Sequence, residues 1–287
     1  MKMFFSKNRT VFKESVLLQE EDILSDLTGN KGSCLFLGRY ALAQVEAVLR
    51  KRNFYKDAKK KKLWPLKFHM DYSEFPLQRF QIFFQKEDLQ NIVVDLKIRE
   101  GTFQPKQKLS SVLPLPSFRF LILDWLTLQN PLQEFSDERI PLPGQKHPGL
   151  NLGKKVLDIF VYLARINRLD GLLAYPAYYH NALLFCRYFQ FLNPEKQAEV
   201  LAIQKALKKI PFKELAWIVH LDCLRDQDNN TYKWEAEELV VPLNKTLKMY
   251  MNSREYDKKV KQNMKKIQFT VDWDCYRKKR NDETQIP

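Results

Sequence analysis

The run of residues 118–128 constrains the fold of this chain more than any other segment. It reads FRFLILDWLTL and is almost continuously apolar, with aromatic and aliphatic residues at most positions. A strand with water on one face alternates apolar and polar residues, whereas a strand covered on both faces is apolar throughout. We therefore predict that this segment is an inner strand of a sheet with packing on each side.

The segments before this run favour further strands, because they are rich in aromatic and aliphatic residues and are bounded by Pro, Gly, Asp or Asn. One of them, residues 92–99, alternates between apolar side chains and mostly polar ones, as in a strand with one buried and one solvent-facing side. The apolar positions are Ile92, Val94, Leu96 and Ile98. An amphipathic helix is predicted upstream, between residues 38 and 53. The expected strands are 66–72, 77–84 and 92–99.

After the inner strand the pattern changes to a polar, proline-rich loop over residues 129–148 and then to helical periodicity over 152–167. The sequence thus predicts a mixed α+β fold, with a mostly antiparallel central sheet flanked by helices. The remaining expected elements are a strand at 172–175, helices at 178–189 and 194–209, strands at 216–224 and 239–243, and a basic helix at 245–266.

Charge is distributed unevenly along the 287 residues, whose net charge is +14. Residues 1–110 carry 21 Lys and Arg against 13 Asp and Glu, residues 111–244 carry 15 against 15, and residues 245–287 carry 12 against 6. Basic ends attract polyanions through counterion release, although a charge run also serves solubility. We divide the chain into a domain at 1–244 and a basic C-terminal extension at 245–287. Nucleic acid or another polyanion is a possible partner of the termini.

The four cysteines, Cys34, Cys186, Cys223 and Cys275, form no CxxC pair and no metal-ligand spacing with histidines. This arrangement argues against a structural zinc site, any other metal site or a disulfide framework. The charged start and the interrupted apolar runs indicate no signal peptide and no transmembrane segment. We therefore expect a cytoplasmic protein with reduced thiols.

A glycine-marked turn, PGLNLGKK at residues 148–155, leads from the long loop into the predicted helix. Amide groups at a helix start have no partner within the helix, and with the helix dipole they form an anion site. Glycines permit close approach of a ligand, and asparagine tolerates a positive φ. A diphosphate would suit this turn, although an ordinary helix cap uses the same residues. The glycine spacing fits neither a P-loop nor a dinucleotide-binding fold.

Residues 149–157 (GLNLGKKVL), 169–176 (LDGLLAYP) and 180–191 (HNALLFCRYFQF) together resemble the core of the GNAT acyltransferase superfamily. The resemblance covers roughly residues 118–192 and implies a GNAT-like fold that uses acetyl-CoA or another acyl-CoA. It implies that the turn binds the pyrophosphate and that the next strand supports the thioester. The cofactor-binding residues implied in this way are Gly149, Asn151, Leu152, Gly153, Lys154, Leu173 and Tyr175.

The chain departs from the family pattern at several chemical groups. Pro148 stands in place of the first Gln or Arg of the turn, Asn151 replaces its middle glycine, and Gln190 replaces the glycine of a later Gly-Phe pair. Cys186 falls where the family often has a tyrosine that protonates the departing thiolate, and we expect its thiol to be buried and inert. The helix and strand periodicity of the family is retained.

Transfer of an acyl group to an amine requires a group that accepts the amine's proton. Asp124, embedded in the apolar strand, is the first candidate, because burial would raise the pKa of its carboxyl; its alternative role is a structural hydrogen bond. His180 is a second candidate base, although a lone histidine is more often a packing residue, and His147 is a further one. Tyr188 is the candidate acid.

Three functions follow from these observations. The first is a coenzyme A-dependent N-acyltransferase that transfers an acyl group, acetyl in the simplest case, to an amine acceptor, over which the loop at 129–148 would close. The second is a catalytically inactive GNAT-like protein that binds nucleic acid or another polyanion. Aromatic residues next to lysines, as in Phe54-Tyr55-Lys56 and Tyr276-Arg277-Lys278, would permit base stacking. A partner-binding role of the helix at 245–266 is a third alternative.

Overall fold

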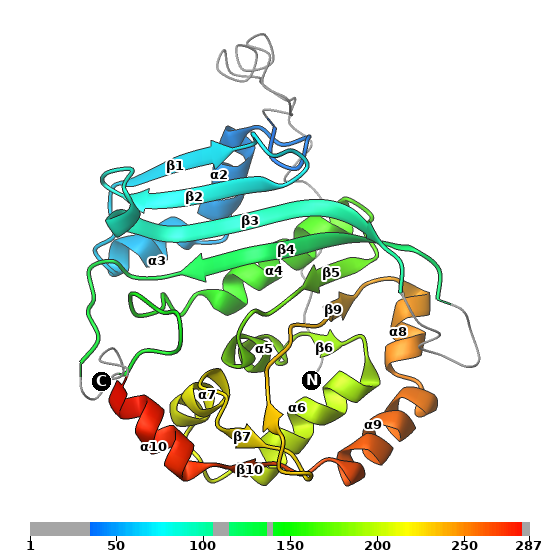
Figure 1. Ribbon diagram of the computed structural model, residues 1–287. Coiled ribbons are helices and arrows are strands. Elements are labelled where there is room, and N and C mark those ends of the chain that lie inside the picture. Colours follow the sequence, from blue (N-terminus) through cyan, green and yellow to red (C-terminus); the bar gives the residue numbers. More distant parts are fainter. Residues whose placement is uncertain (1–34, 106–114, 137–139, 283–287) are drawn as a thin grey trace. The chain divides into compact units, whose positions relative to one another are not determined.

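The computed structural model describes residues 35–105, 115–136 and 140–282. Its main feature is a seven-stranded sheet with strand order β1-β2-β3-β4-β5-β9-β6 (Figure 1). The strands are mostly antiparallel, with β4 and β5 parallel. The predicted mixed α+β fold with a mostly antiparallel sheet flanked by helices is therefore confirmed. The chain divides into two compact units, residues 35–99 with 125–127, and residues 100–124 with those from 128 onward.

The first unit contains two helices and the antiparallel strands that follow them. Buried Gln78 ties the start of the described chain to the sheet, because its amide oxygen accepts from the Leu37 backbone at 2.6 Å and its amide nitrogen donates to the Leu35 carbonyl at 2.8 Å. The elements are α2 (Leu42–Lys51), α3 (Phe54–Lys60), β1 (Leu66–Asp71), β2 (Gln78–Phe84), the 3-10 helix η1 (Leu89–Asn91) and β3 (Ile92–Phe103), whose last residues belong to the second unit.

The second unit contains the parallel crossover from β4 through α4 to β5 and the elements that follow it. Its elements are β4 (Phe118–Leu128), α4 (Gly153–Ile166), β5 (Gly171–Ala174), α5 (Tyr179–Phe185), β6 (Gln190–Phe191), α6 (Pro194–Ala206), α7 (Phe212–His220), β7 (Leu224–Arg225), β8 (Thr231–Tyr232), β9 (Leu239–Pro242), α8 (Lys245–Met251), α9 (Arg254–Lys266), β10 (Thr270–Val271) and α10 (Trp273–Asp282). A small second sheet has the order β10-β7-β8.

The inner strand and the following helix form as the sequence predicts. β4 spans the expected residues, and Phe118, Phe120 and Ile122 are buried in the core of the second unit. α4 buries the stripe at Val156, Ile159, Phe160 and Leu163, whose spacing predicted the helix, and it lies against β5.

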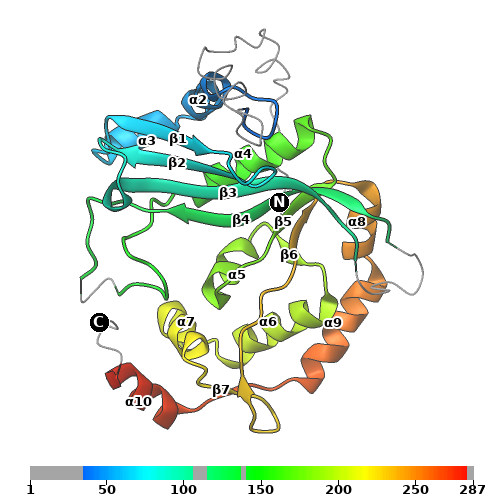
Figure 2. The same ribbon diagram turned by 45° about the horizontal axis from the view of Figure 1, so that its top comes forward.

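The basic C-terminal segment is helical, but it forms two helices where one was predicted over 245–266. The break comes at Asn252 and Ser253, because the Ser253 hydroxyl accepts from the Tyr256 amide at 3.1 Å and begins a new helix. Tyr256 and Val260 are buried in the core cluster of the second unit, and α9 lies beside α6 in both views (Figures 1 and 2). The domain boundary at residue 244 stays a prediction.

Two other expectations differ from the structure. Residues 216–224 were predicted as a strand, whereas α7 covers residues 212–220, because a short run buried on all sides shows neither period clearly. The helix expected at 178–189 ends at Phe185, and the chain turns there to form β6. Both errors concern short segments whose structure depends on their neighbours.

Candidate functional site

The strand register of the second unit brings three residues to one edge of the sheet. Leu123 of β4 pairs with Ala174 of β5, and Ala174 pairs on its other side with Leu239 of β9. The next residue at this edge is Asp124 on β4, Tyr175 after β5 and Glu238 before β9. The Tyr175 hydroxyl donates to the Glu238 carboxylate, Oε1, at 3.4 Å. This edge includes the carboxyl ends of the two parallel strands, where open α/β sheets bind ligands.

At the opposite ends of β4, β5 and β9, close packing and hydrogen bonds hold the three strands together. A Cβ at Gly171 would lie 2.4 Å from the Val241 carbonyl oxygen and 2.9 Å from the Phe120 ring, so only glycine fits there. The Asp170 carboxylate accepts from the Arg119 backbone and from the Asn244 side chain, each at 2.7 Å. β4, β5 and β9 are therefore fastened together at this end. β5 stops at Ala174, whereas β4 continues to Leu128.

The long loop after β4 returns to the point where it leaves the strand. The Asn130 amide donates to the Pro148 carbonyl at 2.8 Å, and the Leu150 amide donates to the Leu128 carbonyl at 3.2 Å. The indole of Trp217 on α7 donates to the Pro141 carbonyl at 2.9 Å. These contacts deliver the chain to the start of α4 beside the carboxyl end of β4.

The start of α4 has the features of an anion site. Asn151 adopts the positive φ that the sequence allowed, 58°, and Leu152 occupies the N-cap position without a side-chain cap hydrogen bond. Within this helix, which the structure describes in full, no acidic residue stands in the first turn. A Cβ at Gly153 would meet no atom within 4 Å, and Lys154 is exposed. No side chain therefore caps this helix start, the space beside Gly153 is open, and the helix dipole and first-turn amides favour a negative group.

Two of the predicted cofactor-binding residues, Leu173 and Gly149, do not lie in the first turn of α4. Leu173 pairs with Ile122 on one side and Val240 on the other, and its side chain is buried in the core cluster. Gly149 forms a β-bridge with Gln129 at the base of the loop. Of the residues that the resemblance assigned to β5, Tyr175 is the one that lies at the open edge, and it is partly exposed.

Asp124 is exposed, so the expectation that it is buried in the strand is wrong. Asp124 lies on the same face of β4 as buried Phe120 and Ile122, and its exposure shows that the covering of this face ends after Ile122. The apolar run therefore marks a covered strand only up to residue 123. The role of Asp124 stays a prediction.

His180 lies in the first turn of α5 and is 2% exposed. Burial, with a smaller contribution from His220, lowers the pKa of its imidazole to about 4. The buried Nδ1 atom has no hydrogen-bond partner, and the Tyr178 ring stacks on the imidazole with centroids 5.2 Å apart. His180 is therefore neutral at physiological pH and is a weak proton acceptor.

The other predicted groups on this segment lie after α5. Tyr188 is half-buried in the turn between α5 and β6. Cys186 is the C-cap residue of α5 and is half-buried, where full burial was expected; partial burial raises the pKa of its thiol to about 11, and its inertness stays a prediction. His147 approaches the Gln133 carbonyl in the loop, with Nδ1 at 3.4 Å. None of these three residues belongs to the strand-end register of Asp124, Tyr175 and Glu238.

The sequence analysis missed Glu237 and Glu238. Partial burial raises the pKa of the Glu237 carboxyl, whose Oε2 accepts from the Asn193 side chain at 3.0 Å. The acidic run at residues 235–238 was visible, but its relevance depends on the pairing of β9 with β5. That pairing joins segments far apart in the sequence, and no local signal reveals it.

A separate cavity of about 400 Å³ lies among α5, α6 and the start of α7. Its lining includes Arg187 and several leucines but no carboxylate. It therefore lacks a group that could accept a proton. The strand-end edge with the start of α4 is the candidate functional site.

Comparison with protein-family models and with curated proteins gives no match for this chain. None of the helices in the described part of the chain has the length and apolar character needed to cross a bilayer. The described residues also hold no cluster of three or more His, Cys, Asp or Glu suited to a metal ion.

Proposed function

We propose that this chain is a coenzyme A-dependent N-acyltransferase of the GNAT type that transfers an acyl group, acetyl in the simplest case, to an amine. The observation that carries the proposal is the crossover from β4 through α4 to β5, in which β5 ends at Ala174 while β4 continues to Leu128, beside which the chain enters the uncapped start of α4. The sheet order and the parallel pairing of β4 with β5 also support it.

In this proposal the first turn of α4 holds the pyrophosphate of acyl-CoA. The amide groups from Leu152 to Lys154 would be the donors, since no side chain caps this helix start, and the exposed Lys154 ammonium would add positive charge. Gly149 and Asn151 shape the turn. The bound carrier supplies an activated acyl thioester at the ends of β4 and β5.

The acceptor chemistry falls to the two carboxylates of the edge. Glu238 is half-buried and hydrogen-bonded to Tyr175, so we assign it the proton of the attacking amine. Asp124 is solvated, so we assign it attraction of the cationic amine. Tyr175 at the same edge and Tyr188 after α5 are the hydroxyl groups that could donate a proton to the departing thiolate. A cytoplasmic location, where acyl-CoA and reduced thiols coexist, accords with this activity.

The first experiment measures thermal unfolding of the full chain with acetyl-CoA, with CoA and with pantetheine. At one hundred times its dissociation constant a ligand adds about 2.7 kcal/mol to the free energy of unfolding. This corresponds to a rise in Tm of about 5 °C or more. Pantetheine lacks the diphosphate and should give a much smaller shift. If acetyl-CoA and CoA at millimolar concentration leave Tm unchanged, the proposal fails.

A second candidate function is binding of single-stranded nucleic acid, and a specific surface of the first unit favours it. Residues 50–62 contain eight Lys and Arg against one Asp. Beside them Trp64 is 42% exposed, the Lys59 ammonium lies 4.2 Å from its ring centroid, and the Tyr55 ring lies 5.6 Å away. Such a platform can stack on bases while lysines contact phosphates. We name it the α2–α3 basic surface; its exposed cations are Arg50, Lys51, Arg52, Lys56, Lys59, Lys60 and Lys62.

The second candidate is tested by the anisotropy of a labelled single-stranded RNA. Binding should weaken steeply as salt rises, and Trp64→Ala should weaken it further because stacking is lost. Deleting residues 245–287 is not a suitable control, because Tyr256 and Val260 belong to the core. Binding to anionic vesicles in preference to RNA, or RNA binding that ignores salt, would count against this function.

A further inference from the structure

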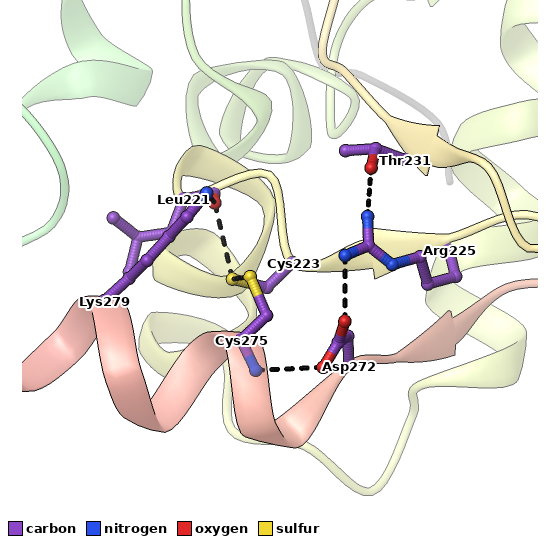
Figure 3. A network of polar contacts seen from close by, with 7 residues as sticks. All are labelled: Leu221, Cys223, Arg225, Thr231, Asp272, Cys275 and Lys279. Atoms are coloured by element: carbon purple, nitrogen blue, oxygen red, sulfur yellow. Dashed lines mark hydrogen bonds and ion pairs between the residues drawn. The ribbon is translucent and has the colours of Figure 1, made fainter.

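Two cysteines that are far apart in the sequence meet in the second unit. Cys223 directly precedes β7, and Cys275 lies in the first turns of α10. Their Sγ atoms are 3.1 Å apart, although the residues are separated by 52 positions (Figure 3). Both thiols are free. A disulfide has an S–S distance of about 2.05 Å, so an approach of about 1 Å would join them.

Contacts on both sides of the sulfur pair hold α10 in this position. β10 pairs with β7, and the Asp272 amide donates to the Cys223 carbonyl at 2.9 Å. The Asp272 carboxylate accepts from the Cys275 amide at 2.9 Å and pairs with Arg225 at 2.8 Å. Farther along the helix the Lys279 ammonium donates to the Leu221 carbonyl at 2.6 Å (Figure 3). The close approach of the two sulfurs is therefore built by several independent contacts.

We propose that Cys223 and Cys275 form a reversible, redox-sensitive disulfide that fastens α10 to β7. The inference does not depend on the proposed acyltransferase activity. It adds a modification site to a chain whose cysteine spacing gave no sign of one. Hydrogen peroxide is the oxidant, and a dithiol reductant reverses the reaction.

The two cysteines differ in accessibility, and this sets the order of the steps. Cys223 is fully buried, and burial together with the hydrogen bond to Cys275 raises the pKa of its thiol to about 12. Cys275 is partly exposed and is the sulfur that the oxidant reaches first. Cys223 is therefore the resolving thiol.

The chemistry balances with one peroxide for each pair. The Cys275 thiolate attacks an oxygen of hydrogen peroxide, the O–O bond breaks, and hydroxide leaves a sulfenic acid on Cys275. The Cys223 sulfur then attacks the Cys275 sulfur, the S–S bond forms, the S–O bond breaks, and the departing hydroxide takes the Cys223 thiol proton and leaves as water; the first hydroxide takes the proton that Cys275 lost when it became a thiolate. Two thiols and one peroxide give one disulfide and two waters.

A Cys223–Cys275 disulfide would change how α10 is attached to the rest of the second unit. In the reduced protein, polar contacts such as the Arg225–Asp272 pair and the Lys279 hydrogen bond retain the helix, and these are partly exposed to water. In the oxidised protein a covalent link closes a long loop and restricts the unfolded chain. Oxidation should therefore slow opening of α10 and raise Tm.

The experiment treats the full chain with hydrogen peroxide and maps the thiols by peptide mass spectrometry. We expect a Cys223–Cys275 peptide, a rise in Tm of about 5–10 °C, and hydrogen exchange of residues 273–282 slowed about tenfold. Dithiothreitol should reverse all three changes. Cys275→Ser, at a partly exposed position, should abolish them without loss of the fold, and Cys186→Ser is the matched control that should retain them.

Each contrary result would overturn the inference. Peroxide that leaves both thiols free, or that oxidises Cys275 to sulfinic acid without a link, shows that the pair does not close. A disulfide made with Cys34 or Cys186 shows that the wrong partners meet. A Cys223–Cys275 bond that leaves the exchange of α10 unchanged shows that it does not fasten the helix.

Discussion

The start of α4 and the α2–α3 basic surface both attract anions, but they do so with different groups. At α4 the donors are backbone amides fixed by the helix, and one exposed lysine stands beside Gly153. On the α2–α3 basic surface the donors are long side chains, most of them exposed, around the Trp64 ring. Fixed amides select a ligand by shape, whereas mobile ammonium groups respond to charge density.

The contrast teaches that positive charge alone is a poor guide to the function of this chain. The +14 net charge directs attention to the lysine runs, although residues 111–244 are neutral. Yet the candidate site lies in this neutral part, where the helix start and the strand ends supply the chemistry. Three measurements separate the two regions, and a fourth tests the buried histidine of α5.

The largest expected effect is on acyl transfer. Glu238→Gln keeps the size of the side chain but removes its capacity to accept a proton, so kcat for amine-dependent CoA release should fall about 100- to 1,000-fold. Asp124→Asn should instead raise KM for a cationic amine several-fold with little change in kcat. Charge removal on the α2–α3 basic surface is the control and should change neither constant. Equal, small effects of both variants would remove the catalytic assignment.

The next effect concerns acetyl-CoA binding at the start of α4. Gly153→Glu places a carboxylate in the open turn, and repulsion of the pyrophosphate should weaken binding about 100-fold by calorimetry. Gly153→Ala is the matched control, because the space around this position accepts a methyl group. The Tm of both variants should stay close to that of the unaltered protein. Retained affinity in Gly153→Glu would mean that the turn is an ordinary helix start.

A smaller effect is expected for RNA on the α2–α3 basic surface. Reversing Lys59, Lys60 and Lys62 to glutamate should lower affinity about 50-fold and reduce the slope of log affinity against log salt by about 2. Acetyl-CoA affinity should not change in this variant. The matched control reverses Lys258, Lys261 and Lys265 on α9. If these α9 variants weaken RNA binding equally, net charge and not the α2–α3 basic surface governs it.

The smallest effect concerns buried His180 and the pH dependence of stability. Its pKa is about 4 in the folded protein and about 6.5 in the unfolded chain, so unfolding takes up a proton as pH falls below 6.5. The free energy of unfolding should therefore decrease by about 2 kcal/mol between pH 7 and pH 5 through this group. His180→Phe should flatten that part of the pH profile in denaturant titrations, whereas exposed His220→Gln should preserve most of it. An unchanged slope in His180→Phe would show that His180 is not the group responsible.

Much of the secondary structure could be predicted from the sequence, because long periodic segments identify themselves. β4 was predicted to the residue, and the α4 stripe at Val156, Ile159 and Leu163 was read correctly. The predictions failed at short segments whose apolar pattern fits a helix and a strand equally well, as in α7, whose apolar run has no clear period. The burial of Asp124 was also misjudged, because an apolar run in the sequence does not show at which residue the neighbouring elements stop covering the strand.

By itself the sequence determined the inner strand β4, the helix α4 that follows it, the glycine-marked turn between them and the uneven charge of the chain. These are local properties that follow from periodicity, from backbone freedom at Asn151 and Gly153, and from composition. Only the tertiary structure decided that Glu238 joins Asp124 and Tyr175 at one edge, and that Cys223 meets Cys275. Both juxtapositions depend on strand pairing between distant segments, and the sequence near each residue contains no record of its partner.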